Sequence, residues 1–158
     1  ENLSEEEFQL QASTDLGALL LDGLGDGVFL RATNCGNEQM KMQTAFGILQ
    51  ATRTRISKTE YISCPSCGRT LFDLQETTAK IRSKTSHLKG LKIGIMGCIV
   101  NGPGEMADAD YGYVGTGVGK ITLYKEKEVV QRNIPSEDAV NALIDLIKTN
   151  GDWVAPSS

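Results

Sequence analysis

Residues 91–105, LKIGIMGCIVNGPGE, decide the fold that we expect for this chain. The apolar residues of segment 91–96 predict a strand. The Gly-Pro-Gly segment 102–104 is incompatible with regular structure and predicts a tight loop soon after this strand. Two side chains that can bind metals, Cys98 and Glu105, lie on or beside that loop. The sequence therefore places them just after the end of a strand.

The sequence on both sides of this stretch alternates strands with helices, which predicts the α/β (α+β) class. Upstream we expect a short strand over residues 61–63 and a helix over residues 69–87 that Gly90 ends. Downstream we expect strands over residues 111–114, 120–124 and 129–132, the last two as a hairpin, and a closing helix with Pro135 near its first position and Gly151 past its end.

The N-terminal part has a different pattern. Two short apolar runs, residues 18–22 and 28–32, are bounded by glycine and aspartate and predict strands buried on both faces. A helix should follow, with Asn34 or Asn37 as its N-cap. Strand, strand and helix in this order indicate part of a larger α/β fold. We therefore divide the chain into an acidic boundary segment, residues 1–15, a second segment, residues 16–57, and a C-terminal domain, residues 58–158.

The composition argues against several classes of function. The chain has 158 residues, four cysteines, one histidine and a formal net charge of -4. A single imidazole, His87, disfavours chemistry that needs several histidines, and the acidic balance disfavours a nucleic-acid partner. The longest apolar run, residues 93–100, is far shorter than the ~20 residues of a membrane span, so we expect a soluble protein. The acidic start has no signal-peptide pattern, and without an initiator Met we expect a piece of a longer protein.

Cys64 and Cys67 form a Cys-x-x-Cys pair, whose two thiolates can face a common centre. Three interpretations of the cysteines stay open from spacing alone. A zinc ribbon needs a second pair, for which the chain offers only Cys98 and a forced His87. A thioredoxin-like redox pair leaves the loop around Cys98 unexplained. An iron-sulfur cluster held by all three cysteines uses both loops.

Glu105 is the candidate for a fourth cluster ligand. A cluster with three cysteine ligands leaves one iron without a thiolate, and a carboxylate is a harder and more readily displaced ligand for that iron. The alternative is that Glu105 is a solvated loop residue, as most glutamates are, although such a residue does not need a Gly-Pro-Gly loop. Cys35 is expected to be a small buried or loop thiol rather than a ligand.

Two motifs, residues 62–69 (ISCPSCGR) and residues 95–105 (IMGCIVNGPGE), closely resemble the C-terminal part of the 4-hydroxy-3-methylbut-2-enyl diphosphate synthase family of the methylerythritol phosphate pathway to isoprenoids. The joint occurrence of both motifs in this order is highly specific. The resemblance implies that residues 16–57 are the last elements of a (βα)8 barrel. It also implies that residues 58–158 are an iron-sulfur domain of the sulfite and nitrite reductase type, with a mixed sheet and flanking helices. Residues 106–115 (MADADYGYVG) are most similar to the plant plastid-like large forms.

The same resemblance implies a 4Fe-4S cluster bound by Cys64, Cys67, Cys98 and Glu105, with Asn101 close to the substrate. The implied reaction is a two-electron reductive ring opening and dehydration of 2-C-methyl-D-erythritol 2,4-cyclodiphosphate, a cyclic diphosphate, to the allylic diphosphate. Electrons would come from ferredoxin, or from flavodoxin in bacterial relatives. The implied location is the plastid stroma, with the bacterial cytoplasm as the alternative.

In the family, most contacts to the substrate's diphosphate come from basic residues of the barrel, and most of the barrel is missing from this chain. We therefore expect this chain alone to assemble a cluster but not to turn over substrate. Turnover would need the remainder of the barrel, in the same chain or in a dimer mate. The alternative function is a non-catalytic zinc-binding or scaffolding module.

Overall fold

The computed structural model describes residues 3–100, 104 and 106–156. The chain divides into two compact units, which we name unit 1 (Glu1–Ser57) and unit 2 (Lys58–Ser158). Within the described part of the chain, no helix combines the length and the apolar character of a membrane span.

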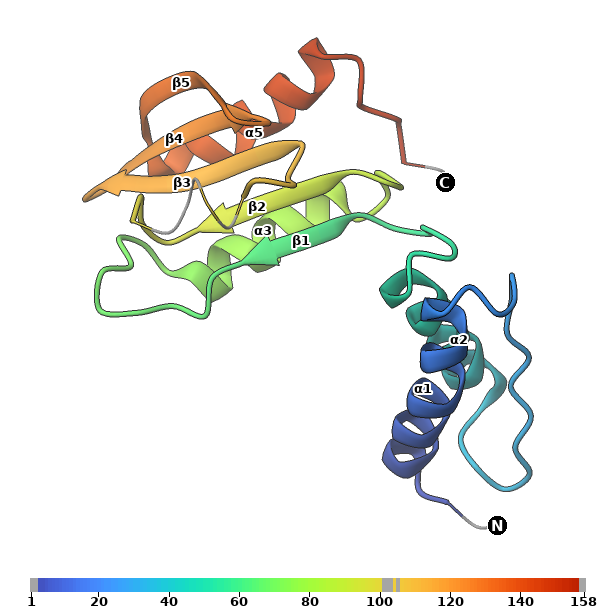
Figure 1. The fold of residues 1–158 in the computed structure, drawn as a ribbon. Coiled ribbons are helices and arrows are strands. Elements are labelled where there is room, and N and C mark those ends of the chain that lie inside the picture. Colours follow the sequence, from blue (N-terminus) through green and yellow to red (C-terminus); the bar gives the residue numbers. More distant parts are fainter. Residues whose placement is uncertain (1–2, 101–103, 105, 157–158) are drawn as a thin grey trace. The chain divides into compact units, whose positions relative to one another are not determined.

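The described part of unit 1 contains two helices, α1 (Glu5–Leu21) and α2 (Glu38–Ala51), which pack against each other (Figure 1). Helix α1 begins at a capping box, in which the Glu7 N–H donates to Ser4 Oγ at 3.3 Å and the Ser4 N–H donates to the Glu7 carboxylate at 2.9 Å. Asn37 caps α2 by accepting the Met40 N–H at 2.8 Å, which confirms one of the two predicted N-caps.

The strands predicted over residues 18–22 and 28–32 are wrong. Residues 18–21 form the last turn of α1, and residues 28–32 have no regular secondary structure. The capping box starts a helix that continues until Gly23, whose φ of 76° ends it. A short apolar run does not by itself distinguish a strand from a helix, and here the helix start signal decides. Helix α1 also runs across the boundary predicted between residues 15 and 16.

Unit 2 is built on a mixed sheet in which β1, β2 and β3 are parallel neighbours and β4 and β5 continue it in antiparallel pairs. The α/β class with a mixed sheet and flanking helices is thereby confirmed; the likeness to sulfite reductases stays a prediction. The five strands are β1 (Glu60–Ser63), β2 (Lys92–Met96), β3 (Tyr111–Gly117), β4 (Lys120–Lys125) and β5 (Glu128–Pro135).

Two helices, α3 (Leu74–Thr85) and α5 (Ser136–Thr149), cover one face of this sheet, behind the strands in Figure 1. Side chains alternate along each strand, so that Ile93, Ile95 and Tyr113 point to the helices and join the main core. Pro135 lies at the N-cap of α5 rather than inside its first turn, and Gly151 follows its end with a φ of 80°.

Helix α3 is shorter than the helix predicted over residues 69–87. It begins at Leu74, because the Asp73 side chain caps it by accepting the Glu76 N–H at 2.8 Å. Residues 69–73 stay outside the helix. The Thr70 N–H closes a turn onto the Cys67 carbonyl, and the Leu71 N–H donates to the Gly97 carbonyl after β2. The prediction started this helix too early because the helical spacing of apolar residues extends back to Leu71, which lies before the N-cap Asp73.

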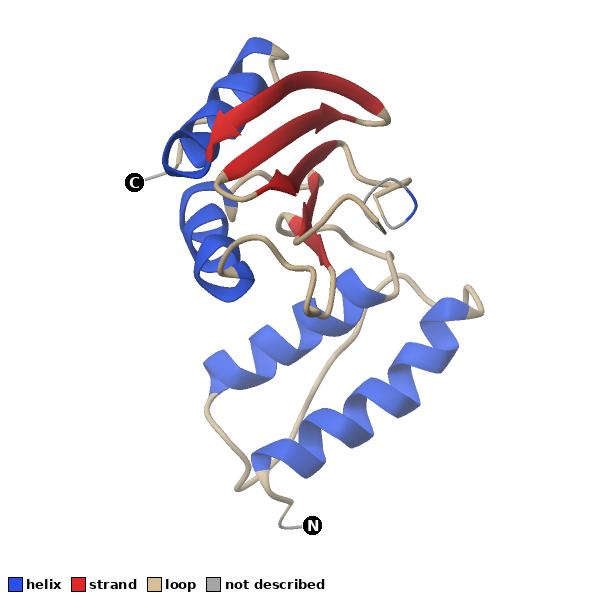
Figure 2. Cartoon of the chain, turned by 90° about the vertical axis from the view of Figure 1, so that its left-hand side faces the viewer, coloured by secondary structure: helices blue, strands red, loops and turns tan. Residues whose placement is uncertain are grey.

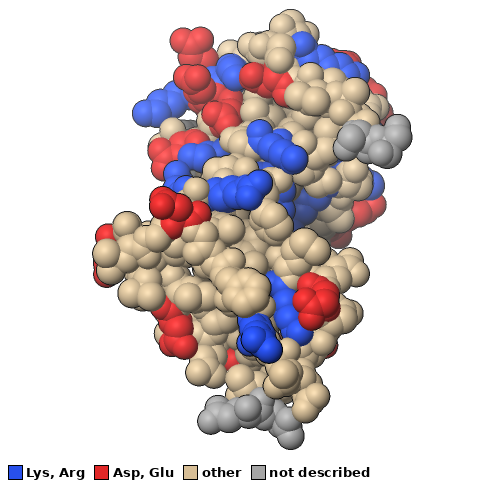
Figure 3. All heavy atoms as spheres, turned by 90° about the vertical axis from the view of Figure 1, so that its right-hand side faces the viewer, with Lys and Arg blue, Asp and Glu red and all other residues tan. Residues whose placement is uncertain are grey.

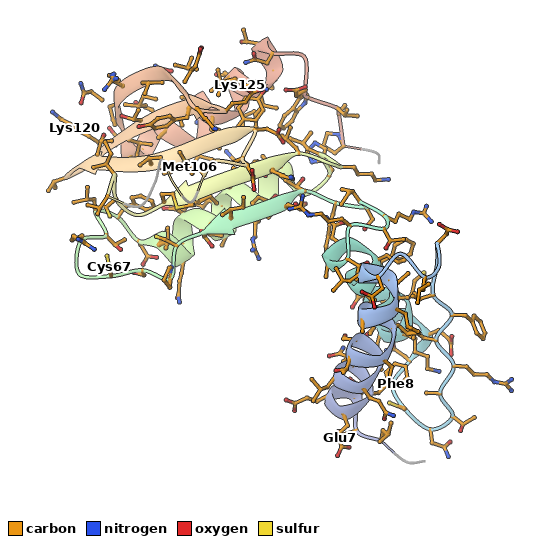
Figure 4. All side chains as sticks on the ribbon, in the orientation of Figure 1. Glu7, Phe8, Cys67, Met106, Lys120 and Lys125 are labelled. Atoms are coloured by element: carbon orange, nitrogen blue, oxygen red, sulfur yellow. The ribbon has the colours of Figure 1, made fainter. Side chains whose placement is uncertain are left out.

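The opposite face of the sheet carries a second, smaller core. Met106 is its centre and lies over β2 and β3, as the label in Figure 4 shows. Gly94 and Gly112 are paired in register across these strands, and a Cβ atom at Gly112 would lie 2.7 Å from the Met106 sulfur. The two glycines therefore form the slot that Met106 fills.

Candidate functional site

Two loops carry the three cysteines of unit 2. The Cys64–Cys67 loop follows β1, and Cys98 follows β2. Ser63 and Ile95 are register partners in this parallel pair, so the loops leave the same edge of the sheet. The arrows of β1, β2 and β3 point to one side in Figure 1, and Figure 2 views the molecule from that side. This is the edge at which open parallel sheets bind ligands.

The three thiols line a single pocket of about 70 Å³. Cys64 and Cys98 are partly buried, whereas Cys67 is exposed. The other residues that line this pocket are Pro65, Ser66, Arg69 and Met96. We name it the cysteine pocket. Residues far apart in the sequence thus line one pocket.

Backbone groups of Gly97 hold Cys64 in place. The Gly97 N–H donates to Cys64 Sγ at 3.3 Å, and the Gly97 carbonyl accepts the Leu71 N–H at 3.1 Å. Hydrogen bonds from backbone N–H groups stabilise a thiolate and tune a metal that the thiolate binds. A glycine is needed here, because a Cβ atom at position 97 would lie 2.8 Å from the Thr70 methyl group.

The turn around Cys67 favours the thiolate. Ser66 has a φ of 65°, which turns the chain sharply before Cys67. The Arg69 backbone N–H, and after it the Arg69 side chain, hydrogen-bond Cys67 and lower the pKa of its thiol, despite some opposing desolvation. Because the thiolate is the form that binds metals, this turn prepares Cys67 as a ligand. Figure 4 shows Cys67 on the loop that follows β1.

The three thiols of the cysteine pocket are soft donors of the kind that bind zinc or iron. Within the described ranges, no three Cys, His, Asp or Glu side chains are grouped as a single metal ion would need. In a tetrahedral zinc site, with Zn–S near 2.3 Å, the sulfurs lie about 3.8 Å apart. Thiolates are ligands of both zinc ions and iron-sulfur clusters.

Two predicted site residues, Asn101 and Glu105, lie outside the described residues. The other two candidates for a ligand role are not among the residues that line the cysteine pocket. Cys35 is buried in unit 1, where its thiol contacts the Ser4 carbonyl at 3.7 Å. His87 bonds the Val154 carbonyl through Nε2 at 2.9 Å and stacks edge-on against Trp153.

Sequence reasoning missed Arg69, Thr70 and Gly97 as parts of the site. Each acts through a backbone group or a short contact that residue type alone does not reveal. The available signal was position: Arg69 and Thr70 follow the Cys-x-x-Cys turn directly, and Gly97 precedes Cys98.

On the face drawn in Figure 3, basic and acidic side chains are interspersed, which agrees with a net charge of only -4.

The fold and the site define an α/β domain that gathers three cysteines at the carboxyl edge of parallel strands. Residues 60–149 match the GcpE protein C-terminal domain, and the chain belongs to this family.

Curated relatives carry the name of a synthase. Over 149 residues the chain is 69% identical to the 4-hydroxy-3-methylbut-2-en-1-yl diphosphate synthase (flavodoxin) of Parabacteroides distasonis, covering 94% of this chain and 24% of the relative. It is 56% identical over 153 residues to the flavodoxin-named synthase of Leptospira interrogans, covering 97% of this chain and 23% of the relative. It is 59% identical over 155 residues to the chloroplastic synthase (ferredoxin) of Oryza sativa, covering 98% of this chain and 21% of the relative.

These relatives refine the sequence prediction. The chain spans about a quarter of the length of the curated relatives that it matches. The expected C-terminal part is therefore supported, but the plant plastid-like form is not confirmed, because the Parabacteroides relative is more similar than the rice one.

Proposed function

We propose that this chain is the cluster-binding C-terminal part of a 4-hydroxy-3-methylbut-2-en-1-yl diphosphate synthase. The whole enzyme would convert 2-C-methyl-D-erythritol 2,4-cyclodiphosphate to 4-hydroxy-3-methylbut-2-enyl diphosphate by reductive ring opening and loss of water. The observation that carries the proposal is the cysteine pocket, in which thiols from two loops meet at one sheet edge of a chain 69% identical to such a synthase.

Cys64, Cys67 and Cys98 would hold a 4Fe-4S cluster, with Glu105 as its fourth ligand and Asn101 near the substrate. When bound, the cluster supplies electrons one at a time for the reduction. The residues of the chain prepare the ligands: the Gly97 N–H donates to Cys64, and Arg69 donates to Cys67. The Arg69 guanidinium also brings a positive charge to the cysteine pocket, which offsets the negative charge of bound thiolates.

The proposed function also implies partners for this chain. The electron donor is a flavodoxin or a ferredoxin, and the higher identity to the flavodoxin-named relative from Parabacteroides favours flavodoxin. The same comparison favours the bacterial cytoplasm over the plastid stroma. The remainder of the barrel, in the same chain or a dimer mate, supplies most substrate contacts, so the 158-residue chain alone should not turn over substrate.

Iron content after anaerobic purification tests the cluster. We expect a brown protein with about four irons per chain. The Cys98→Ser variant should lose most of the iron, whereas the matched control Cys35→Ser should keep it, because Cys35 lies outside the cysteine pocket. A colourless protein with one stoichiometric zinc would instead establish the zinc-binding module.

The Glu105→Ala variant tests the fourth ligand separately. We expect its cluster to form but to be lost faster in air, because one iron then lacks a protein ligand. An unchanged, air-stable cluster would remove Glu105 from the ligand set while leaving the three cysteines in it.

A further inference from the structure

Thr70 connects the two loops that carry the cysteines. On one side its hydroxyl accepts the Cys67 N–H at 3.1 Å and lies 3.2 Å from Ser66 Oγ. Its own backbone N–H donates to the Cys67 carbonyl at 2.9 Å. Thr70 therefore bonds both the N–H and the carbonyl of Cys67, which closes the turn that presents this thiol.

On its other side Thr70 packs onto Gly97. A Cβ atom at Gly97 would lie 2.8 Å from Thr70 Cγ2 and 2.9 Å from its Oγ1, closer than side-chain carbons approach. The Thr70 side chain thus rests on the backbone directly before Cys98. The next residue, Leu71, reinforces the contact by donating its N–H to the Gly97 carbonyl at 3.1 Å.

Gly97 links the remaining two cysteines to Thr70. Its N–H donates to Cys64 Sγ at 3.3 Å, and Cys98 is its covalent neighbour. A path of contacts runs from Cys67 through Thr70 and Gly97 to Cys64 and Cys98. A ligand set that is held in place before the metal arrives loses less conformational entropy on binding.

We propose that Thr70 is the positioning residue that holds the Cys64–Cys67 loop against Gly97, and so keeps the three thiols arranged for the cluster. The proposal rests on the proposed function, because it assumes that these thiols bind a cluster. Threonine suits this role because its hydroxyl serves the Cys67 turn while its methyl group contacts Gly97. A serine keeps the first contact and a valine keeps the second.

The test uses Thr70→Val and Thr70→Ser in the 158-residue chain, with Thr78→Val as the matched control. Thr78 carries a buried hydroxyl that has no hydrogen-bond partner among the described residues, so its removal should change nothing. Each protein is reconstituted anaerobically with iron and sulfide, and the rate at which a chelator removes the iron is measured, together with the electron paramagnetic resonance spectrum of the reduced cluster.

We expect Thr70→Val to lose iron about tenfold faster than wild type and to show an altered spectrum, as changes beside metal ligands do. Thr70→Ser should lie between Thr70→Val and wild type, because it keeps the hydrogen bond to the Cys67 N–H but loses the methyl group that contacts Gly97. Chelation rates and spectra of Thr70→Val that equal those of wild type would overturn the role of Thr70. A wild-type chain that takes up no iron would instead overturn the proposed function, and the inference with it.

A double-mutant cycle tests the contact even if Thr70→Val folds poorly. Gly97→Ala places a methyl group against Thr70, and Thr70→Ala removes the two nearest atoms. We expect the double variant to hold iron longer than Gly97→Ala alone, because the second change relieves the clash of the first. Strictly additive losses would show that the two residues do not act together and would overturn the proposal.

Discussion

The two units of the chain differ in how much apolar surface each buries by itself. In unit 2 one continuous core fills the space between the sheet and its two helices, with Ile95 and Leu143 fully buried. The described part of unit 1 has two small clusters, one around Phe8 and one around Leu20. Large apolar side chains are exposed in both units, among them Phe29 at 86% and Leu21 at 71% in unit 1 and Val118 at 89% in unit 2.

This difference separates a domain that completes its own core from one that does not. The described part of unit 1 buries its apolar side chains only in small clusters, and the chain spans about a quarter of the length of its relatives. Both facts support the proposal that unit 1 belongs to a larger domain, the barrel, whereas unit 2 carries the cysteine pocket on a self-sufficient scaffold.

A matched pair of leucines should give the largest difference between the units. Leu143→Ala opens a cavity in the core of unit 2 and should lower its free energy of unfolding by about 2–5 kcal/mol. Leu20→Ala removes the same atoms from a small cluster that can collapse around the gap, and it should leave the unfolding of unit 2 unchanged. Urea titration followed by the fluorescence of Trp153, the single tryptophan, reports on unit 2.

The comparison fails if Leu20→Ala shifts the Trp153 transition as far as Leu143→Ala does. The units would then unfold as one cooperative body. Hydrogen exchange of the α1 and α2 amides provides the complementary measurement, and there Leu20→Ala should increase exchange while Leu143→Ala should not.

A pair of glycines should give opposite signs in the two units. A Cβ atom at Gly115 would lie 2.5 Å from the Gly97 carbonyl oxygen, so Gly115→Ala forces β3 and the cysteine loop apart. We expect it to cost about 1–3 kcal/mol of stability and to weaken iron binding. Gly47 lies inside α2 with nothing within 4 Å of an added Cβ atom, so Gly47→Ala should stabilise unit 1 by about 0.5–1 kcal/mol.

Thermal unfolding and iron uptake measured on both glycine variants decide this prediction. A Gly115→Ala protein with unchanged melting and iron content would show that the sheet and the loop tolerate separation. The close approach of Gly115 to Gly97 would then be incidental to the cysteine pocket.

The same contrast explains which parts of the fold the sequence could predict. The strands of unit 2 were predictable because alternating or continuous apolar runs are bounded by clear turn signals, such as Gly90 before β2. The strands expected in unit 1 were wrong because the run over residues 18–22 suits a strand and a helix equally, and the capping box of Ser4 and Glu7 went unused. A unit with only small buried clusters gives a weak hydrophobic pattern in its sequence, because few of its apolar side chains face a core.

The sequence could predict only those site residues whose side-chain type itself indicates their chemistry. Spacing alone left three interpretations of the cysteines open, and the family resemblance implied Cys64, Cys67 and Cys98 as ligands; the structure places these three residues around one pocket. Thr70 and Gly97 could not be found in this way, because their roles depend on a hydroxyl that meets a backbone N–H and on a missing side chain. Such contacts exist only once the two loops are folded together.

The smallest effect that we predict concerns a carboxylate in each unit. In unit 2 the Tyr111 hydroxyl donates to Asp152 at 2.6 Å, and Lys125 pairs with the same oxygen at 3.1 Å. These bonds, Tyr111 first, hold the pKa of Asp152 below its usual 3.8. In unit 1 the hydrogen bond from the Ser4 backbone, followed by that from its hydroxyl, lowers the pKa of Glu7.

Both carboxylates therefore stabilise the folded state above their ordinary pKa and lose that contribution as the pH falls, because the unfolded chain then binds more protons. For partly exposed Asp152 we expect about 1 kcal/mol or less, lost below pH 3.8. Tyr111 acts on the opposite side: burial and Asp152 raise its pKa to about 12, so its contribution is lost as the pH rises from 10 toward 12.

Urea midpoints measured through Trp153 across these pH ranges separate the two units. Asp152→Asn should flatten the acid-side loss of stability of unit 2, and Tyr111→Phe should reduce the loss on the alkaline side, where buried Tyr113 also titrates with a pKa of about 12. Glu7→Gln should leave both slopes unchanged, since its capping box belongs to α1. If Glu7→Gln alters the acid slope reported by Trp153, the charge state of unit 1 is coupled to the core of unit 2, and the independence inferred from their cores does not hold.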